Sequence, residues 1–221
     1  MECKRPNRVP LVLLLLLITL VPDSAAVGQE VILKNDSVSD FSEAIIVTGF
    51  VSGEKAAAWL TTPCEGHIVR VQIFWRSQFG GTADSLEESI EIFQAGTFPT
   101  PGSRLLELLG PSMVDGALNE FTVPVPIAVE QNQTFVVSLK FLEAPPAVVG
   151  PSVVVDTDGC QAGKNGIFAI PGGWFSSCVL DVSGDFVIRA VVDCEAEVDS
   201  IFSDGFESGN TSAWSSAEPP P

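Results

Sequence analysis

The stretch His67-Ile68-Val69-Arg70-Val71-Gln72-Ile73-Phe74-Trp75-Arg76-Ser77 decides the fold class, because apolar and polar side chains alternate along it. A period of two is that of a half-buried β-strand, whose successive side chains point to opposite faces of the sheet. The residues predicted to face the core are Val69, Val71, Ile73 and Trp75, and those predicted to face outward are Arg70, Gln72 and Arg76.

The same alternation occurs in two further stretches, Gln133 to Glu143 and Gly184 to Cys194. The first places on one face Phe135, Val137, Leu139 and Phe141. The second points Phe186, Ile188, Ala190 and Val192 inward and Asp185, Arg189 and Asp193 outward. These three stretches predict the central strands of an antiparallel sheet structure.

Shorter strand candidates lie between clusters of turn residues such as Gly80-Gly81 and Pro171-Gly172-Gly173. They are Ala44 to Gly49, Lys55 to Leu60, Ser89 to Gln94, Arg104 to Leu109, Phe121 to Val129, Ser152 to Asp156 and Gly166 to Ile170. Only Ala83 to Glu88 and Leu105 to Leu109 could instead be short helices. Many short strands at this spacing predict an all-β fold, an antiparallel β-sandwich of the jelly-roll type.

Two prolines lie inside one of the strand candidates. Pro124 and Pro126 flank Val125, and proline cannot donate a hydrogen bond to a neighbouring strand. The candidate Phe121 to Val129 is therefore predicted to be an edge strand or to carry a bulge.

The two ends of the chain differ from its body. Residues 1–26 read as a signal peptide: Lys4, Arg5 and Arg8 precede an apolar run, and small residues follow at Ser24-Ala25-Ala26. The run is shorter than the roughly 20 residues that span a bilayer. Cleavage after Gly28 is an alternative to cleavage after Ala26. The predicted organisation is a signal peptide at 1–26, a β-sandwich domain at 27–194 and an acidic tail at 195–221.

The composition excludes several classes of partner. The 221 residues carry 11 Lys or Arg against 28 Asp or Glu, a formal net charge of −17. Nucleic acids and anionic membranes attract basic surfaces, so neither is an expected partner. No later segment reads as a membrane span. The protein is expected to be secreted or associated with the cell envelope, with an extracellular glycan or a surface protein as its partner.

Four cysteines remain once Cys3 leaves with the signal peptide. Cys160 and Cys178 bracket a stretch that reads as a hairpin, which favours a bridge between them. Cys64 precedes one strong strand and Cys194 ends another, so antiparallel pairing of those strands would bring the two together. We therefore predict the disulfides Cys64–Cys194 and Cys160–Cys178. A zinc site with His67 is the competing interpretation, but no C-x-x-C pair supports it.

The C-terminal tail carries a recognisable motif. Its residues are Phe202, Asp204, Gly205, Phe206, Glu207, Ser208, Gly209 and Trp214. This pattern resembles the F-x-D-G-F-E-S-G-x-x-x-x-W ending of exported bacterial proteins for which no activity is established. The segments from Gly53 to Leu60, Phe98 to Gly102 and Gly184 to Ala190 look like the jelly-roll modules found beside such tails.

The resemblance implies a bacterial secreted or envelope-associated protein whose tail is a sorting or docking element. The alternative hypothesis is a terminal segment whose aromatic residues, Phe202, Phe206 and Trp214, pack on the sandwich.

The sequence gives little support for catalysis. His67 is the single histidine and lies at the start of a strand, which favours a structural role over that of a general base. No G-x-S-x-G nucleophile motif and no phosphate-binding loop are present. The densest acidic group contains Asp84, Glu87, Glu88 and Glu91, and a solvated loop is the favoured interpretation of it. We therefore expect the protein not to be an enzyme and to use no cofactor.

Two binding hypotheses remain. Asp156 and Asp158 follow a strand beside Gly159 and could supply oxygen ligands to calcium, although an ordinary Asp turn is the alternative. Trp174, after a Gly-rich turn, and Phe79 are the rings most expected to form a carbohydrate-binding platform. Trp75 shares a face with core residues and is expected to be buried.

The expected function is that of a non-enzymatic exported module for binding or structure, at the cell surface or in the extracellular space. A calcium-assisted carbohydrate-binding module is the alternative. Exposure of Trp174 and convergence of Asp156 with Asp158 would favour the alternative.

Overall fold

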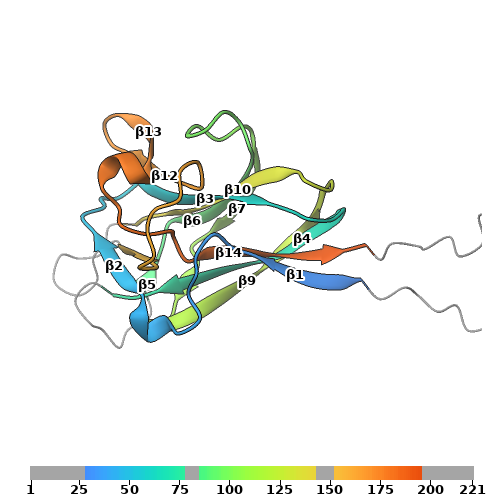
Figure 1. Ribbon diagram of the computed structural model, residues 1–221, viewed down its shortest axis with the longest axis horizontal. Helices are drawn as coiled ribbons and strands as arrows, with labels where there is room; N and C mark the ends of the chain where they lie inside the picture. Colours follow the sequence, from blue (N-terminus) through green and yellow to red (C-terminus); the bar gives the residue numbers. More distant parts are fainter. Residues whose placement is uncertain (1–27, 78–84, 143–151, 196–221) are drawn as a thin grey trace, which may run out of the picture.

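The computed structural model describes residues 28–77, 85–142 and 152–195, which form two β-sheets packed face to face (Figure 1). The four-stranded sheet contains, in spatial order, β1 (Gln29–Leu33), β14 (Ile188–Cys194), β4 (Gly66–Trp75) and β9 (Ala117–Val129). The six-stranded sheet contains, in spatial order, β13 (Gly173–Ser176), β12 (Asn165–Ala169), β3 (Lys55–Thr61), β10 (Thr134–Lys140), β6 (Ser89–Gln94) and β7 (Arg104–Leu109).

Four short strands form two small sheets beside the main layers. They are β2 (Ile45–Thr48) with β11 (Ser152–Val155), and β5 (Ser85–Leu86) with β8 (Ser112–Met113). Every pairing between described strands is antiparallel. The predicted all-β antiparallel sandwich is confirmed.

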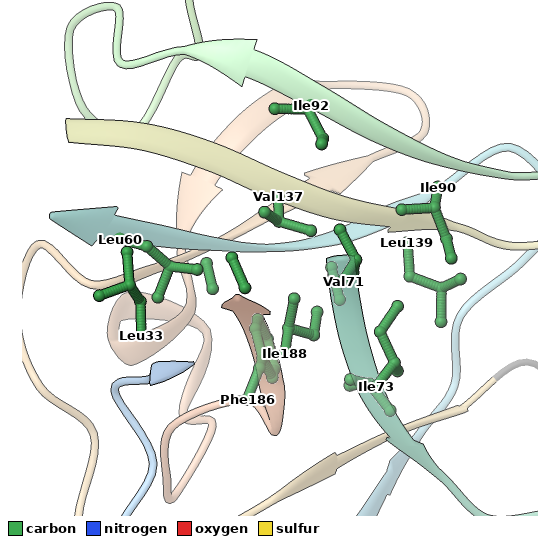
Figure 2. Close-up of a cluster of buried hydrophobic side chains, with 14 of the residues drawn as sticks. Leu33, Leu60, Val71, Ile73, Ile90, Ile92, Val137, Leu139, Phe186 and Ile188 are labelled. Carbon is green, nitrogen blue, oxygen red and sulfur yellow. The ribbon is translucent and has the colours of Figure 1, made fainter. Parts of the chain in front are cut away.

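The core lies between the two main sheets, where apolar side chains of both layers point toward one another (Figure 2). The predicted inward faces of β10 and β14 are confirmed, because both sets of residues belong to this core. They are Phe135, Val137, Leu139 and Phe141 on one side and Phe186, Ile188, Ala190 and Val192 on the other, all fully buried. Trp75 is also fully buried, as expected.

One residue of β4 does not follow the predicted alternation. The partner strand β14 pairs Val192 with Ile68 and Val191 with Arg70, which leaves Val69 as an extra residue in a bulge. Ile68 therefore enters the core in place of Val69, which is half-buried. A bulge shifts the register by one residue, and strict alternation cannot indicate where this occurs.

The strand with two prolines is both an edge strand and irregular, as predicted. β9 ends the four-stranded sheet, and its pairing with β4 shifts between Thr122 and Ile127. Pro124 and Pro126 lie within that interval. The missing proline N–H groups thus fall where no regular ladder is formed.

A second apolar cluster covers the outer side of the four-stranded sheet. The chain between β1 and β2 packs Val38 and Ala44 against Phe74 of β4. Under this segment Arg189 donates from Nε to Asp36 over 2.9 Å, and both residues are buried. Arg189 does lie on the outward side of β14, as predicted, but the N-terminal segment shields it from solvent.

The two helical alternatives are wrong in the part that the structure describes. Leu105 to Leu109 belongs to β7, and Ser85–Leu86 within the other segment is a strand. Within the described ranges the helices are two 3-10 turns, η1 (Phe41–Glu43) and η2 (Ser177–Leu180). No helix there is long and apolar enough to cross a membrane. The predicted signal peptide at 1–26 and the tail after Glu195 lie outside the described residues.

Candidate functional site: the outer face of the six-stranded sheet

The outer face of the six-stranded sheet is the surface that faces away from the core. Along β3, Ala56 and Leu60 point into the core, so the alternating residues Lys55 and Trp59 point outward. The cross-strand register then places Phe168 of β12 beside Lys55. The neighbouring pair of this register is Phe168 with Trp174 of β13, at the edge of the sheet.

Four rings on this face make ring-to-ring contacts and are called the aromatic cluster below: Trp59, Phe98, Phe168 and Trp174. The ring centroid of Trp59 lies 5.0 Å from that of Phe98 and 6.1 Å from that of Trp174, both edge-on. The rings of Phe168 and Trp174 lie 5.5 Å apart. These are favourable aromatic geometries. Trp59 is buried, whereas the other three rings are half-buried and leave part of their surface in solvent.

Trp59 is held in place by a hydrogen bond and by a glycine. Its indole Nε1 donates to the carbonyl oxygen of Ala95 over 3.1 Å. A Cβ added at Gly166 of β12 would lie 2.7 Å from the Trp59 ring. The absence of a side chain at Gly166 therefore lets the Trp59 ring lie over β12 and reach Trp174. The half-buried ring of Trp174 thus rests on a rigid support.

Charged side chains continue the face toward its other edge and are called the charged network below: Lys55, Glu91, Arg104 and Glu107. Lys55 Nζ lies 2.5 Å from one carboxylate oxygen of Glu91, and Arg104 Nη1 lies 3.0 Å from the other. Arg104 Nη1 also contacts Glu107 over 2.9 Å. Glu91 itself is only 2% exposed. Its burial beneath two cations orients their side chains along the sheet.

Lys55 connects the charged network to the rings. Its Nζ lies 5.8 Å from the ring centroid of Phe168 and 5.4 Å from that of Phe93. An ammonium group above an aromatic face is attracted by the electrons of the ring. The face is thus a continuous strip from Trp174 to Arg104.

The structure describes one of the two predicted platform residues, Trp174. Trp174 was expected in a loop, but it lies in strand β13, half-buried against Trp59 and Phe168. The preceding Pro171-Gly172-Gly173 forms the turn between β12 and β13, which is the predicted hairpin. Phe79 lies outside the described residues.

The two predicted calcium ligands differ in burial and in their partners. Asp156 is buried, and its carboxylate accepts hydrogen bonds from the backbone N–H groups of Ser37 and Asp185, each over 2.8 Å. The side chain of Asp158 is exposed. Within the described ranges, no three His, Cys, Asp or Glu residues form a group that could hold a metal ion. Asp156 also lines a small polar pocket with Asp40 and Glu43.

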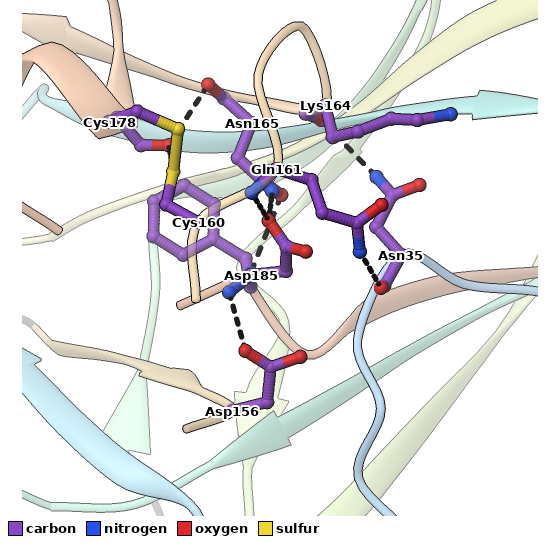
Figure 3. Close-up of a disulfide and its surroundings, with 10 residues drawn as sticks. Asn35, Asp156, Cys160, Gln161, Lys164, Asn165, Cys178 and Asp185 are labelled. Carbon is purple, nitrogen blue, oxygen red and sulfur yellow. Dashed lines mark hydrogen bonds between the residues drawn. A yellow bond between two sulfur atoms is a disulfide. The ribbon is translucent and has the colours of Figure 1, made fainter. Parts of the chain in front are cut away.

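Both predicted disulfides are present, Cys64–Cys194 and Cys160–Cys178. Figure 3 shows the second beside a buried polar group centred on Asp185. The carboxylate of Asp185 accepts hydrogen bonds from Asn165 over 2.5 Å and from the backbone N–H of Gln161 over 3.0 Å. These bonds join the loop after β11 to β12 and to the segment that precedes β14.

Two carboxyl groups have raised pKa values. Burial raises the pKa of Glu87 to about 7, against the opposing effect of hydrogen bonds from Leu142 N–H and the Trp75 indole. Burial also raises the pKa of Asp185, and the negative charge of Asp156 adds to this effect. Both side chains are almost fully buried, at 2% and 0% exposed. Asp185 was predicted to face outward, and that prediction is wrong.

The densest acidic group, which was predicted to be a solvated loop, is largely buried or paired within the fold. Glu87 and Glu91 are buried, and Glu88 pairs with Lys140 across the sheet. Asp84 lies outside the described residues. By contrast, His67 has the expected place at the start of β4, half-buried, with Nδ1 3.9 Å from a carboxylate oxygen of Glu195.

No protein-family model matches the chain, and no curated protein matches it. Among solved structures it is similar to the cysteine protease and lectin-like domains of Cwp84, a surface layer associated protein of Clostridium difficile. The TM-score is 0.46 and the identity 13%, over 69% of this chain and 36% of that one.

A second structure, the clostridial cysteine protease Cwp84 after propeptide cleavage, gives a TM-score of 0.46 and 15% identity. It covers 69% of this chain and 41% of that one. This chain therefore spans less than half the length of either structure. At this level of identity, nothing of the activity of that protein transfers to this chain.

Most members of the aromatic cluster and charged network were not found from the sequence. No local sequence pattern predicts that Phe98, Phe168 or Lys55 belongs to the site, because their partners lie far away in the chain. Strand alternation could have placed Trp59 opposite to Leu60 and hence outside the core. The register that brings Trp174 and Arg104 onto the same face is a property of the sheet.

Proposed function

We propose that the protein is an exported, non-enzymatic binding module whose ligand-binding surface is the outer face of the six-stranded sheet. The observation that carries this proposal is the ring of Trp174, half-buried and resting on Trp59 and Phe168. The main core is formed without any ring of the aromatic cluster. Rings on the outside of a sheet that the core does not need are typical of a recognition surface.

The rigidity of the cluster supports binding. Trp59 is 4% exposed and is fixed by its bond to Ala95. Trp174 is held against it on one side and against Phe168 on the other. A ring that is already ordered loses little freedom when a ligand binds, so more of the contact energy contributes to affinity.

The buried carboxyl groups support a binding role over a catalytic one. A general acid or base must reach a proton of its substrate. Both oxygens of Glu87 accept hydrogen bonds, from Trp75 and from Leu142, and the residue is 2% exposed. Asp185 is fully buried between Gln161 and Asn165. Their raised pKa values therefore follow from structural burial.

Export is supported by the sequence and by the disulfides. Residues 1–26 have the features of a signal peptide. The disulfides Cys64–Cys194 and Cys160–Cys178 are typical of proteins that fold in an oxidising compartment. Both observations agree with a module that acts outside the cytoplasm.

Tryptophan fluorescence of the oxidised protein from residue 27 onward tests this function. The protein is titrated with soluble polysaccharides and peptides, in calcium and in a chelator. We expect a saturable change with at least one ligand, and calorimetry, which does not need the Trp174 ring as a reporter, should show weaker binding of that ligand to Trp174→Ala. Removal of an aromatic anchor should weaken binding by about 10-fold or more.

The matched control is Phe175→Ala. Phe175 is the next residue of β13 and pairs with Ile167, so its ring lies on the opposite side of the strand from Trp174. This variant should bind as the wild type does. Unchanged affinity in Trp174→Ala, or no saturable response to any ligand, would refute the proposal. A response only in calcium would instead favour a calcium-assisted module.

A further inference from the structure

We infer that the ligand of this surface is an extended chain of neutral sugar units that lies across the strands of the six-stranded sheet. The inference rests on the proposed function and names the substrate class of the same surface. Three features carry it: the length of the strip, the balance of its charges, and the absence of free main-chain groups along its centre.

The strip is long and continuous. The ring of Trp174 contacts Phe168, and Lys55 Nζ lies 5.8 Å above the ring of Phe168. Lys55 contacts Glu91, and Glu91 contacts Arg104 on the far edge strand. These side chains extend over six strands, a span of about 24 Å at the usual spacing between strands. A ligand that touches both ends must therefore be an extended polymer.

The charges along the strip cancel. Lys55 and Arg104 contribute two positive charges, and Glu91 and Glu107 contribute two negative ones. The whole chain carries a formal net charge of −17. A polyanion would gain no net attraction from the strip and would be repelled by the molecule. A neutral ligand requires no net charge on the strip. It can still form hydrogen bonds with the ammonium, guanidinium and carboxylate groups of the charged network.

The chemistry of the strip fits sugars better than peptides. An extended peptide binds best along a free strand edge, through main-chain hydrogen bonds. The four inner strands of this sheet, β12, β3, β10 and β6, are paired on both sides, so those groups are already used. A pyranose ring has an apolar face of C–H groups and a rim of hydroxyls. The apolar C–H face can pack on the rings of Trp174 and Phe168, and the hydroxyl groups can form hydrogen bonds with Lys55 and Arg104.

Affinity electrophoresis and calorimetry of the oxidised protein from residue 27 onward test the inference. The neutral probes are xyloglucan, glucomannan and dextran, and the anionic probes are alginate and polygalacturonate. Extended peptides form a third class. For a neutral polymer that binds, oligosaccharides of two to six units are then compared. We expect retardation by a neutral polymer and about 10-fold or greater gain in affinity from the shortest to the longest oligosaccharide.

Variants at the two ends of the strip test whether the ligand binds there. Phe168→Leu keeps an apolar side chain but removes the ring, and Arg104→Gln changes the opposite end. Each should weaken binding of the neutral polymer by about fivefold, whereas Phe175→Ala should not change it. Thermal unfolding of each variant shows whether the sandwich is intact. If Arg104→Gln destabilises the fold, Phe168→Leu and the length series decide the result.

The outcomes separate this inference from the proposed function. Binding of an anionic polymer or a peptide that requires Trp174 would overturn the inference and leave the binding surface in place. Equal affinity for the shortest and the longest neutral oligosaccharide would overturn the extended ligand alone. If no probe binds in a way that depends on Trp174, both the inference and the proposed function are wrong.

Discussion

Glu87 shows how a single residue can link stability to pH. Its carboxylate accepts hydrogen bonds from Trp75 and from the backbone of Leu142, yet it is 2% exposed. Burial raises its pKa from an ordinary 4.5 to about 7, so the folded state holds a proton more tightly than the unfolded chain does. Its contribution to stability is full below pH 4.5 and is lost as the pH rises to about 7.

Glu87→Gln should remove this pH dependence. The shift of the pKa corresponds to about 3 kcal/mol of stability lost between pH 4.5 and 7. We therefore expect Glu87→Gln to lower the stability at pH 5 more than at pH 8, measured by urea unfolding. The comparison with the wild type cancels the parallel effect of Asp185, whose pKa is also raised.

Glu43→Gln is the control for this measurement, because Glu43 is exposed in η1. This substitution should change the stability at both pH values equally. The explanation fails if Glu87→Gln behaves in the same way as Glu43→Gln.

At the scale of an element, strand β12 shows how a glycine shapes the neighbouring surface. Gly166 lies within the strand, and its φ is outside the left-handed region that favours glycine. Its role is to leave room for the Trp59 ring, since an added Cβ would lie 2.7 Å from it. The strand thereby permits the contact between Trp59 and Trp174.

Gly166→Ala should destabilise the protein by about 1–3 kcal/mol and alter the tryptophan fluorescence, because the Trp59 ring must move. A double-mutant cycle with Trp59→Phe tests the cause. The smaller ring should reduce the cost of the alanine at position 166. An equal cost in both backgrounds would show that contact with Trp59 is not the reason. Chemical denaturation of the four proteins gives the required free energies.

Elements also show the limits of sequence patterns. The prolines of β9 predicted an edge strand or a bulge, because a missing N–H has the same consequence in any sheet. No residue type near Val69 indicates the bulge at that position. It depends on how β4 matches two neighbouring strands at once, and so the alternation predicted the wrong inward residue there.

At the scale of the whole molecule, the disulfides differ in how much chain they enclose. Cys64–Cys194 closes a separation of 130 residues, and Cys160–Cys178 closes one of 18. The first joins the segment before β4 to the end of β14, beside the start of β1 (Figure 1). In the chain-entropy description, a longer closed loop restricts the unfolded chain more.

The double variant Cys64→Ala with Cys194→Ala should therefore lose more stability than Cys160→Ala with Cys178→Ala. The expected losses are about 5 and about 3 kcal/mol. Guanidinium unfolding of the two oxidised variants and the wild type measures them. The reverse order would show that local packing around the bridges, including the Asp185 group, outweighs loop closure.

The sequence by itself determined the fold class, the inward faces of β10 and β14 and the irregular edge strand β9, and it favoured one disulfide pairing. These follow from local chemistry: the period of a strand, the missing N–H of proline, and the ends of antiparallel neighbours. The tertiary structure alone decided which side chains meet across the sheet. Arg189 finds Asp36, and Lys55 finds Glu91, only because register and layer packing bring distant segments together.

The same reason applies to the candidate site. Trp174 was singled out from its own turn, but its support by Trp59 and Phe168 depends on the order β13-β12-β3 and on the open space at Gly166. A local pattern records which face a residue occupies, whereas its neighbours on that face are set by strand order.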